Sequence, residues 1–422
     1  MTARFTYRIV ASALHDAASV AELTTPISSV LDSLGGAEET TDRRATAQAD
    51  PDGRGAGPRL LVVATGGTER SLLDEIGDST APVVLVAHRA HNSLPAALET
   101  LAAIRARGGR GRIVFAGGAD AGRAELDEAI GDLETVSRLA STRLGVVGGP
   151  SSWLVASSPS AETVERVWGP RIVTVDPARM IELTRAPVVP TGPLAERFTS
   201  VADPVRSTVG RRAVDDAMGV QAALTDVLET HALDAVTVRC FDLLGDPGTS
   251  GCLALASLND DGVVAGCEGD VPSTLAMLLV RHLLGRPAWM ANPAQVEPGR
   301  NRLVLAHCTV APSMVDDLAL DTHFESGRGV GISGRFAPQP VTLLRVGGPD
   351  LDQCWIAEGA IVATGDDPDL CRTQVTVELS SGHVDDLLER PLGNHLVLAT
   401  GHHQRRLRRW WELAIGVCSV RT

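Results

Sequence analysis

The chain contains no lysine, and all 38 of its basic residues are arginine. This absence excludes enzymes that hold a carbonyl substrate or pyridoxal phosphate through a lysine, and it excludes a P-loop that ends in Gly-Lys-Ser/Thr. Arginine cannot take over these roles, because its guanidinium group stays protonated and is a poor nucleophile. Several large classes of enzyme are therefore ruled out before any motif is considered.

Aromatic residues and positive charge are scarce as well. Aromatic side chains make up 3% of the chain, with Tyr7 as the single tyrosine, and the net charge is −14 at pH 7. A negative protein with few rings for stacking is poorly suited to nucleic acid or to an anionic membrane surface. We therefore expect neither of them as a partner.

Long apolar runs and paired cysteines are also missing. Residues 1–26 lack the continuous apolar core of a signal peptide, and the most apolar helical stretch, residues 274–284, is too short to span a membrane. The seven cysteines are an odd number without a CxxC pair, which is typical of reduced thiols. These features predict a soluble cytoplasmic protein.

The 422 residues, 44% of them hydrophobic, are enough for about three globular domains. In the first third, predicted strands alternate with predicted helices, which implies a parallel sheet with right-handed crossovers. A long surface loop is expected over residues 38–58. The predicted strands are residues 5–11, 59–64, 82–87 and 112–116, and the predicted helices are residues 17–34, 69–76 and 93–107.

A second α/β series follows, and the pattern changes to short β-like runs from about Asn301. The second series has predicted strands at 143–148, 172–175, 235–239 and 253–257, with helices at 206–231 and 273–284. The later runs, separated by turns, favour an antiparallel barrel or sandwich and cover 302–306, 341–346, 353–363, 374–379 and 395–400, before a helix at 404–415.

The predicted fold class is therefore α/β, with two Rossmann-like parallel-sheet domains followed by a β-rich, barrel-like C-terminal domain. We place the N-terminal domain at residues 1–140. The second domain, residues 141–300, carries Glu268 and Asn292, and the β-rich domain, residues 301–422, carries His307 and His395.

Three short motifs each allow two interpretations. Gly66-Gly67-Thr68-Glu69 is typical of a tight turn in which Thr68 caps a helix, although such a turn can also hold an anion or a sugar hydroxyl. The GxGxxG pattern at residues 329–334 precedes a predicted strand instead of a helix, which favours a β turn over a nucleotide site. The arginine-rich segment 405–411 has apolar residues at helical spacing, which favours an amphipathic helix over a nucleic-acid site.

Cysteines near strand ends form a further group. Their spacing does not match a zinc knuckle, so small buried thiols are favoured and a zinc thiolate is the alternative. The group consists of Cys240, Cys252, Cys267 and Cys308.

The strongest cluster joins polar residues that flank several predicted elements. It contains Glu268, Asp270, Asn292, His307 and His395. Polar groups at the ends of adjacent elements converge on a crevice, which is where α/β sheets bind ligands. A carboxylate, an amide oxygen and two imidazoles suit a divalent ion such as Mn²⁺. Separate helix caps and buried core histidines explain the same spacing equally well.

The order of these segments resembles the L-fucose isomerase and L-arabinose isomerase superfamily, especially its shorter, L-fucose-isomerase-like branch. The likeness extends over nearly the whole chain. The segments that carry it are residues 65–69, 92–99, 143–148, 153–157, 267–270, 306–308 and 394–395.

The resemblance implies roles for individual residues. Glu268 would be a metal ligand and the acid/base, His395 the C-terminal ligand, and His307 the match to a metal-binding histidine of the arabinose branch. Asn292 falls where these isomerases carry an acidic ligand, and its amide brings neither a negative charge nor a proton shuttle. Asp270 is the second predicted catalytic residue, because it could serve the substrate oxygens.

The implied activity is a metal-dependent aldose–ketose isomerisation through an enediolate, with Mn²⁺ or another divalent cation. The expected substrate is a pentose or 6-deoxyhexose such as L-fucose, D-arabinose or L-arabinose. Family resemblance also implies a homo-oligomer, a hexamer, in which a neighbour's first domain closes the site. Two alternatives stay open: a non-catalytic sugar-binding or regulatory protein, and another metal-assisted reaction such as epimerisation or class II aldol cleavage.

Overall fold

A computed structural model describes residues 3–39, 57–117, 119–185, 198 and 206–416, and these form two compact units. Unit 1 comprises Met1–Ala140 and Arg408–Val417, and unit 2 comprises Ser141–Leu407 and Cys418–Thr422. The expected surface loop over residues 38–58 lies mostly outside the described residues. The division into three domains stays a prediction.

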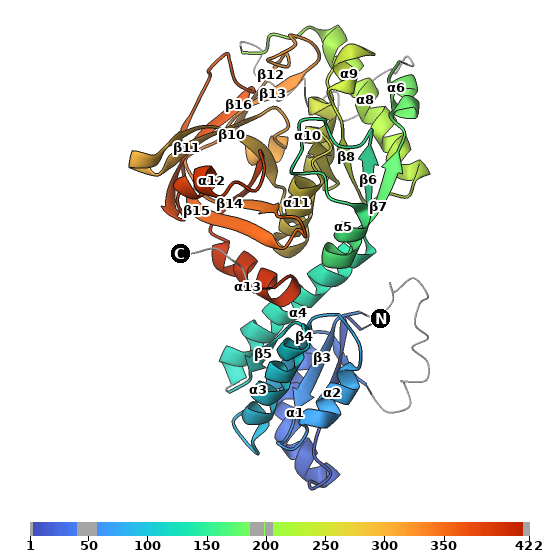
Figure 1. Ribbon diagram of the computed structural model, residues 1–422, viewed down its shortest axis with the longest axis vertical. Helices are drawn as coiled ribbons and strands as arrows, with labels where there is room; N and C mark the ends of the chain where they lie inside the picture. The colour runs from blue at the N-terminus through green and yellow to red at the C-terminus, as the bar shows by residue number, and fades with distance from the viewer. Residues whose placement is uncertain (1–2, 40–56, 118, 186–197, 199–205, 417–422) are drawn as a thin grey trace. The chain divides into compact units, whose positions relative to one another are not determined.

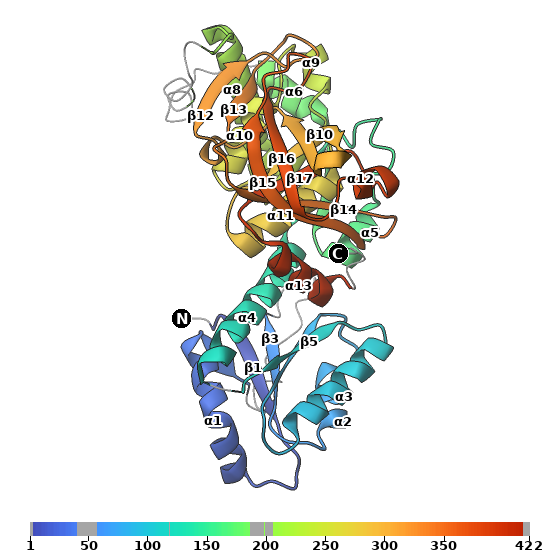
Figure 2. The ribbon, with the colours of Figure 1, turned by 90° about the vertical axis from the view of Figure 1, so that its left-hand side faces the viewer.

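Unit 1 is built on a parallel five-stranded sheet with the order β2-β1-β3-β4-β5. Helices α1 (Ala17–Ser33) and α4 (Ala119–Ser141) cover one face, and α2 (Glu69–Ile76) and α3 (Ser93–Ala106) cover the other (Figure 2). The strands are β1 (Phe5–Val10), β2 (Gly36–Glu38), β3 (Arg59–Val63), β4 (Val83–Ala87) and β5 (Gly111–Phe115).

The central strands of this sheet are buried on both faces, which explains their sequence. Leu60 and Val62 pack toward α1 and α4, whereas Leu61 and Val63 pack toward α2 and α3. Strands enclosed in this way appear in a sequence as continuous apolar runs. The predicted Rossmann-like arrangement is confirmed here.

Unit 2 begins with a second parallel sheet, in the order β7-β6-β8-β9. Its strands are β6 (Arg143–Val147), β7 (Arg171–Val175), β8 (Ala235–Val238) and β9 (Val264–Cys267). The helices of this part are α5 (Ala161–Trp168), α6 (Pro177–Arg185), α8 (Arg211–Thr230), α9 (Asp242–Gly245), α10 (Cys252–Asp260) and α11 (Val271–Leu284).

One predicted strand of this sheet is wrong. Residues 253–257 belong to helix α10, in which every residue from Cys252 to Asn259 is buried. A run buried on all sides carries no periodic pattern, so an apolar strand and an apolar helix look alike. Alanine and leucine, which dominate this run, favour the helix. The fourth strand is instead β9, which was not anticipated.

The predicted β-rich region forms a closed antiparallel barrel in the order β10-β11-β16-β15-β14-β17. Alternate residues, such as Leu303 and Leu305 of β11, join one continuous core. This alternation follows from the two-residue repeat of a strand with one face turned inward. The strands are β10 (Trp289–Glu297), β11 (Arg302–His307), β14 (Pro340–Gly347), β15 (Gln353–Thr364), β16 (Thr373–Ser381) and β17 (Leu396–Thr400).

Smaller elements complete the two units. A hairpin of β12 (Asp317–Asp321) and β13 (Gly331–Arg335) stands beside the barrel. The remaining elements are η2 (Pro298–Arg300), η3 (Pro312–Met314), α12 (Asp385–Glu389) and α13 (Gln404–Ala414). Among the described residues, no helix is both long and apolar enough to cross a bilayer.

Helix α11 connects the sheet of unit 2 to the barrel. It contacts β8 and β9 on one side and β10, β14 and β17 on the other (Figure 1). Every residue from Val271 to Val280 is buried, as expected for a helix that is apolar all round. The helix therefore holds the turn that precedes it, Glu268–Asp270, against the barrel.

The short motifs take mostly the favoured interpretation. The expected β turn at residues 329–334 is wrong, because residues 331–334 lie in strand β13, although no helix of a nucleotide site follows them either. Leu407, Trp410 and Trp411 form the buried side of α13, as expected for an amphipathic helix. Thr68 is the N-cap residue of α2, as expected, but its hydroxyl donates to the Thr65 carbonyl at 2.8 Å and makes no side-chain cap bond.

Candidate metal centre

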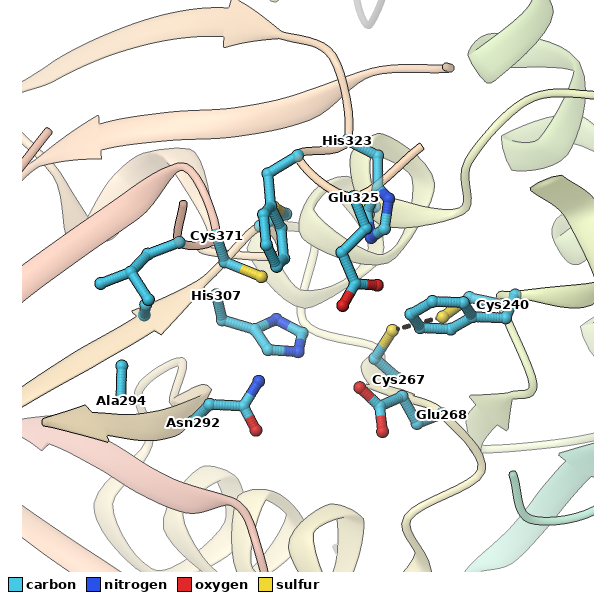
Figure 3. Close-up of a pocket in the computed structure, with 15 residues that line it drawn as sticks. Cys240, Cys267, Glu268, Asn292, Ala294, His307, His323, Glu325 and Cys371 are labelled. Carbon is cyan, nitrogen blue, oxygen red and sulfur yellow. Dashed lines mark hydrogen bonds between the residues drawn. The ribbon is translucent and has the colours of Figure 1, made fainter. Parts of the chain in front are cut away.

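A cavity of about 200 Å³ lies in unit 2 where the turn after β9 meets the barrel (Figure 3). Its wall comes from the sheet, from β10 and β11, and from the loop between β12 and β13. The lining residues are Cys240, Phe241, Cys252, Cys267, Glu268, Asn292, Ala294, Ala306, His307, Cys308, His323, Phe324, Glu325, Leu370 and Cys371.

Three buried side chains from distant parts of the chain meet beside this cavity. One ligand atom each of Glu268, His307 and His395 lies within 4.8 Å of the other two. Glu268 follows β9, His307 ends β11, and His395 immediately precedes β17. Within the described part of the chain, no other set of three such side chains converges in this way.

His395 is completely buried, and its two ring nitrogens face different partners. Its Nδ1 donates a hydrogen bond to Oδ2 of Asp270 at 2.9 Å. Its Nε2 makes no hydrogen bond to a described residue and lies 3.5 Å from Oε1 of Glu268. Burial alone would lower the pKa of His395, but the bond to Asp270 and the neighbouring Glu268 carboxylate raise it to about 9.

Asp270 is held in turn by Arg345, which is itself buried. Nη1 of Arg345 lies 3.2 Å from Oδ2 of Asp270, and it donates to Ser273 Oγ at 2.7 Å, while Nη2 donates to Ser157 Oγ at 2.6 Å. Burial opposes ionisation, but the charge of Arg345 and the bond from His395 hold the pKa of Asp270 well below its usual range. Asp270 does not line the cavity, and its expected catalytic role stays a prediction.

The backbone at Glu268 adopts a conformation that side chains rarely take. Its φ is +62°, and Gly269 follows at +71°. A Cβ on Gly269 would lie 2.3 Å from the Gly149 carbonyl oxygen, so only glycine fits there. A non-glycine residue in the left-handed region costs of order 1 kcal/mol, and such residues are concentrated at functional sites.

The two carboxylate oxygens of Glu268 have separate surroundings. Nε1 of Trp153 donates to Oε2 at 2.6 Å, while Oε1 faces His395. Burial alone would raise the pKa of Glu268. The hydrogen bond and charge of His395, and then the hydrogen bond from Trp153, lower this pKa, so the carboxylate is ionised at neutral pH. One oxygen is therefore fixed in place and the other faces the histidines.

His307 is neutral near pH 7, because burial, and then the charge of His395, lowers its pKa to about 4. Its Nδ1 lies 2.8 Å from Thr309 Oγ1, which leaves Nε2 for another partner. Asn292 pairs with Ala306 across the barrel ladder, and Figure 3 shows its amide directed into the cavity toward His307.

These residues fit a divalent cation. The set offers a carboxylate, two imidazoles and an amide oxygen, which are donors that Mn²⁺ and similar ions accept. The buried, unbonded Nε2 of His395 is an orphaned polar atom that such an ion would satisfy. A carboxylate on the far ring nitrogen is also the usual means by which proteins orient a metal-binding histidine.

The four cysteines near predicted strand ends are confirmed as small buried thiols. Cys240 and Cys267, whose sulfur atoms are 2.7 Å apart, line the cavity together with Cys252, Cys308 and Cys371, and all of them are free. In the described residues, the group that could hold a metal ion contains none of these cysteines.

Sequence reasoning did not single out several residues of the site. Arg345 could have been found from the sequence, because a charged residue inside the apolar run of β14 indicates that it has a buried partner. Trp153 opens one of the segments that carry the resemblance, but its contact with Glu268 spans 115 positions and had no signal in the sequence. Thr309 and Glu325 had none either.

No family model matches the chain, but it is similar to curated proteins named sulfoquinovose isomerase. The protein from Alkalicoccus urumqiensis is 26% identical over 195 residues, which are 44% of this chain and 43% of that protein. The one from Clostridium sp. (strain MSTE9) is 30% identical over 131 residues, or 30% and 29% of the two chains. The one from Priestia aryabhattai is 30% identical over 83 residues, or 19% of each. The matched stretches thus span less than half the length of these relatives.

Proposed function

We propose that this protein is a metal-dependent aldose–ketose isomerase that moves a sugar carbonyl between C1 and C2. The observation that carries the proposal is the convergence of Glu268, His307 and His395 within 4.8 Å beside a cavity. Similarity to proteins named for a sugar isomerase supports the same class of reaction.

The reaction needs a base close to a weakly acidic carbon. Glu268 is ionised and oriented by Trp153, so it can take the proton from C2 and return it to C1, while a second proton moves from the O2 hydroxyl to O1. A divalent cation held by Glu268, Asn292, His307 and His395 would stabilise the negative charge that develops on the substrate oxygens. Asp270 acts through His395 as a positioning residue.

The proposed substrate is a pentose or 6-deoxyhexose such as L-fucose, D-arabinose or L-arabinose. Resemblance to the L-fucose-isomerase-like branch supports it, as does the architecture of two parallel sheets and a β-barrel. Sulfoquinovose is the second candidate, because the relatives carry its name. We also propose a cytoplasmic homo-oligomer, a hexamer, in which a neighbour's first domain closes the cavity.

Ketose formation from a panel of aldoses with Mn²⁺ tests the proposal. Chelation and Glu268→Gln should each abolish turnover, since loss of a general base typically costs about 10²- to 10⁴-fold. Glu297→Gln is a matched control, because Glu297 is an exposed carboxylate at the end of β10 that does not line the cavity. Full turnover by Glu268→Gln would overturn the assignment of the base.

The Asn292 amide favours a second function, a sugar-binding or regulatory protein without turnover. Such a protein would bind sugar after chelation and form no ketose. An epimer or a cleaved product in the same assay would instead indicate another metal-assisted carbohydrate reaction.

A further inference from the structure

Glu325 lies in the loop between β12 and β13 and lines the same cavity as Glu268 and His307. Figure 3 shows its carboxylate directed into the cavity, toward the side where Glu268 and His307 lie. The cavity wall therefore carries two carboxylates, that of Glu268 in the candidate metal centre and that of Glu325 on the loop between β12 and β13.

The loop that carries Glu325 is held by hydrogen bonds within it and by bonds to Ser250. The His323 amide donates to the Arg328 carbonyl at 3.0 Å, and the Gly327 amide donates to the His323 carbonyl at 2.8 Å. Ser250 Oγ accepts from the Val330 amide at 2.9 Å and donates to the Val330 carbonyl at 2.8 Å. These bonds place the loop, and with it the Glu325 carboxylate, over the cavity.

No arginine among the described lining residues offsets this negative charge, and the chain has no lysine. The arginines nearest in sequence to the loop and the wall are directed elsewhere, and Arg239, beside Cys240, donates to Asp242 Oδ2 at 2.8 Å. Nη1 of Arg328 donates to the Leu244 carbonyl at 2.9 Å, and Nε of Arg372 donates to the Thr322 carbonyl at 2.8 Å. Within the described lining, a sulfonate or phosphate near Glu325 would meet a carboxylate and no arginine.

We propose that Glu325 is a specificity-determining residue, which accepts hydrogen bonds from the hydroxyl groups of a neutral sugar and repels a sugar that carries an anionic group. A carboxylate is an acceptor only, so it suits hydroxyl donors and not sulfonate oxygens. Like charges brought together on binding reduce affinity steeply, by roughly 100-fold. This inference rests on the proposed function. It predicts that this protein prefers a neutral sugar over sulfoquinovose, the sugar in the names of its relatives.

The test compares sulfoquinovose with 6-deoxyglucose, which lacks only the sulfonate group at C6, alongside the best neutral substrate of the panel. For the wild type we expect kcat/KM to favour the neutral sugar of the pair by about 100-fold. Glu325→Gln should lower this ratio of kcat/KM values to about tenfold, chiefly through a lower KM for sulfoquinovose. Glu325→Arg should make the two kcat/KM values equal or make sulfoquinovose the better substrate. The control Glu297→Gln should leave the ratio unchanged.

The proposal would be overturned if the wild type preferred sulfoquinovose, or if Glu325→Gln left the ratio of the two kcat/KM values unchanged. It would also be overturned if Glu325→Gln lost all turnover but still bound sugar, because Glu325 would then be a catalytic residue. If no sugar is turned over, calorimetric Kd values for the same pair decide the matter. Selective binding of the neutral sugar then supports the role of Glu325, whereas equal binding, or binding of neither, contradicts it.

Discussion

His395 and Asp270 share a hydrogen bond of 2.9 Å although 125 positions separate them in the sequence, and both side chains are completely buried. The bond connects the start of β17 in the barrel to the N-cap of α11 beside the sheet. It occupies Nδ1 of the histidine, and for this reason Nε2 faces Glu268. The orientation of one candidate ligand thus depends on a residue outside the cavity.

Replacing Asp270 by asparagine should weaken metal binding without removing the helix cap, since asparagine caps helices as well as aspartate does. Loss of the oriented carboxylate should reduce the affinity for Mn²⁺ by about 10- to 100-fold. The buried charge of Arg345 would lose its partner, so we also expect a loss of about 3 kcal/mol or more in the free energy of unfolding. Calorimetry and urea unfolding measure the two effects.

The exposed Asp385, in the first turn of α12, offers a matched control. Asp385→Asn should change neither the affinity for Mn²⁺ nor the stability appreciably. An unaltered affinity in Asp270→Asn would show that His395 does not depend on this bond.

The affinity for the cation should rise with pH. Since the pKa of His395 is about 9 in the metal-free protein, this side chain is protonated at pH 7 and must release its proton to bind a metal ion. The affinity should therefore increase about tenfold per pH unit up to pH 9 and then level off. His307, with its pKa of about 4, should contribute nothing to this slope above pH 6.

Calorimetry in buffers of different ionisation enthalpy measures the proton released on binding Mn²⁺ between pH 6 and pH 8. We expect close to one proton per ion over this range. An affinity that does not vary with pH would argue against His395 as a ligand.

Gly269→Ala should destabilise the protein more than an ordinary substitution at a left-handed glycine. The added Cβ would meet the Gly149 carbonyl oxygen at 2.3 Å, in addition to the strain of a φ of +71°. Gly285, the C-cap of α11, has a φ of +68° but nothing within 4 Å of a Cβ, so it isolates the strain. Gly285→Ala should cost about 1 kcal/mol, and Gly269→Ala clearly more, by urea unfolding. Equal costs would contradict the close approach at Gly269.

Asn292→Asp should strengthen metal binding. The residue lines the cavity on β10, and the change adds a negative charge beside a site that holds one carboxylate and two imidazoles. We expect at least about a tenfold gain in Mn²⁺ affinity at pH 7, measured by calorimetry. Asn292→Ala should lower the affinity. An aspartate variant that binds no better than the wild type would place Asn292 outside the coordination sphere.

Much of the fold could be predicted because its determinants are local. The runs 60–63 and 83–87 are apolar throughout, since parallel strands are covered on both faces, and the barrel strands alternate because one face is turned inward. The same reasoning failed at residues 253–257, where burial on all sides removed the periodicity that distinguishes a helix from a strand.

The sequence by itself determined the alternation of helices and strands, the exclusion of lysine chemistry, and the ends of elements at which Glu268, His307 and His395 lie. Only the tertiary structure decided that these three side chains meet, that Arg345 and Asp270 orient His395, and that Trp153 and Glu325 join the site. The reason is physical. Strand and helix patterns arise from contacts between near neighbours in the sequence, whereas the site depends on barrel closure and on the packing of α11, which join residues 75 to 125 positions apart.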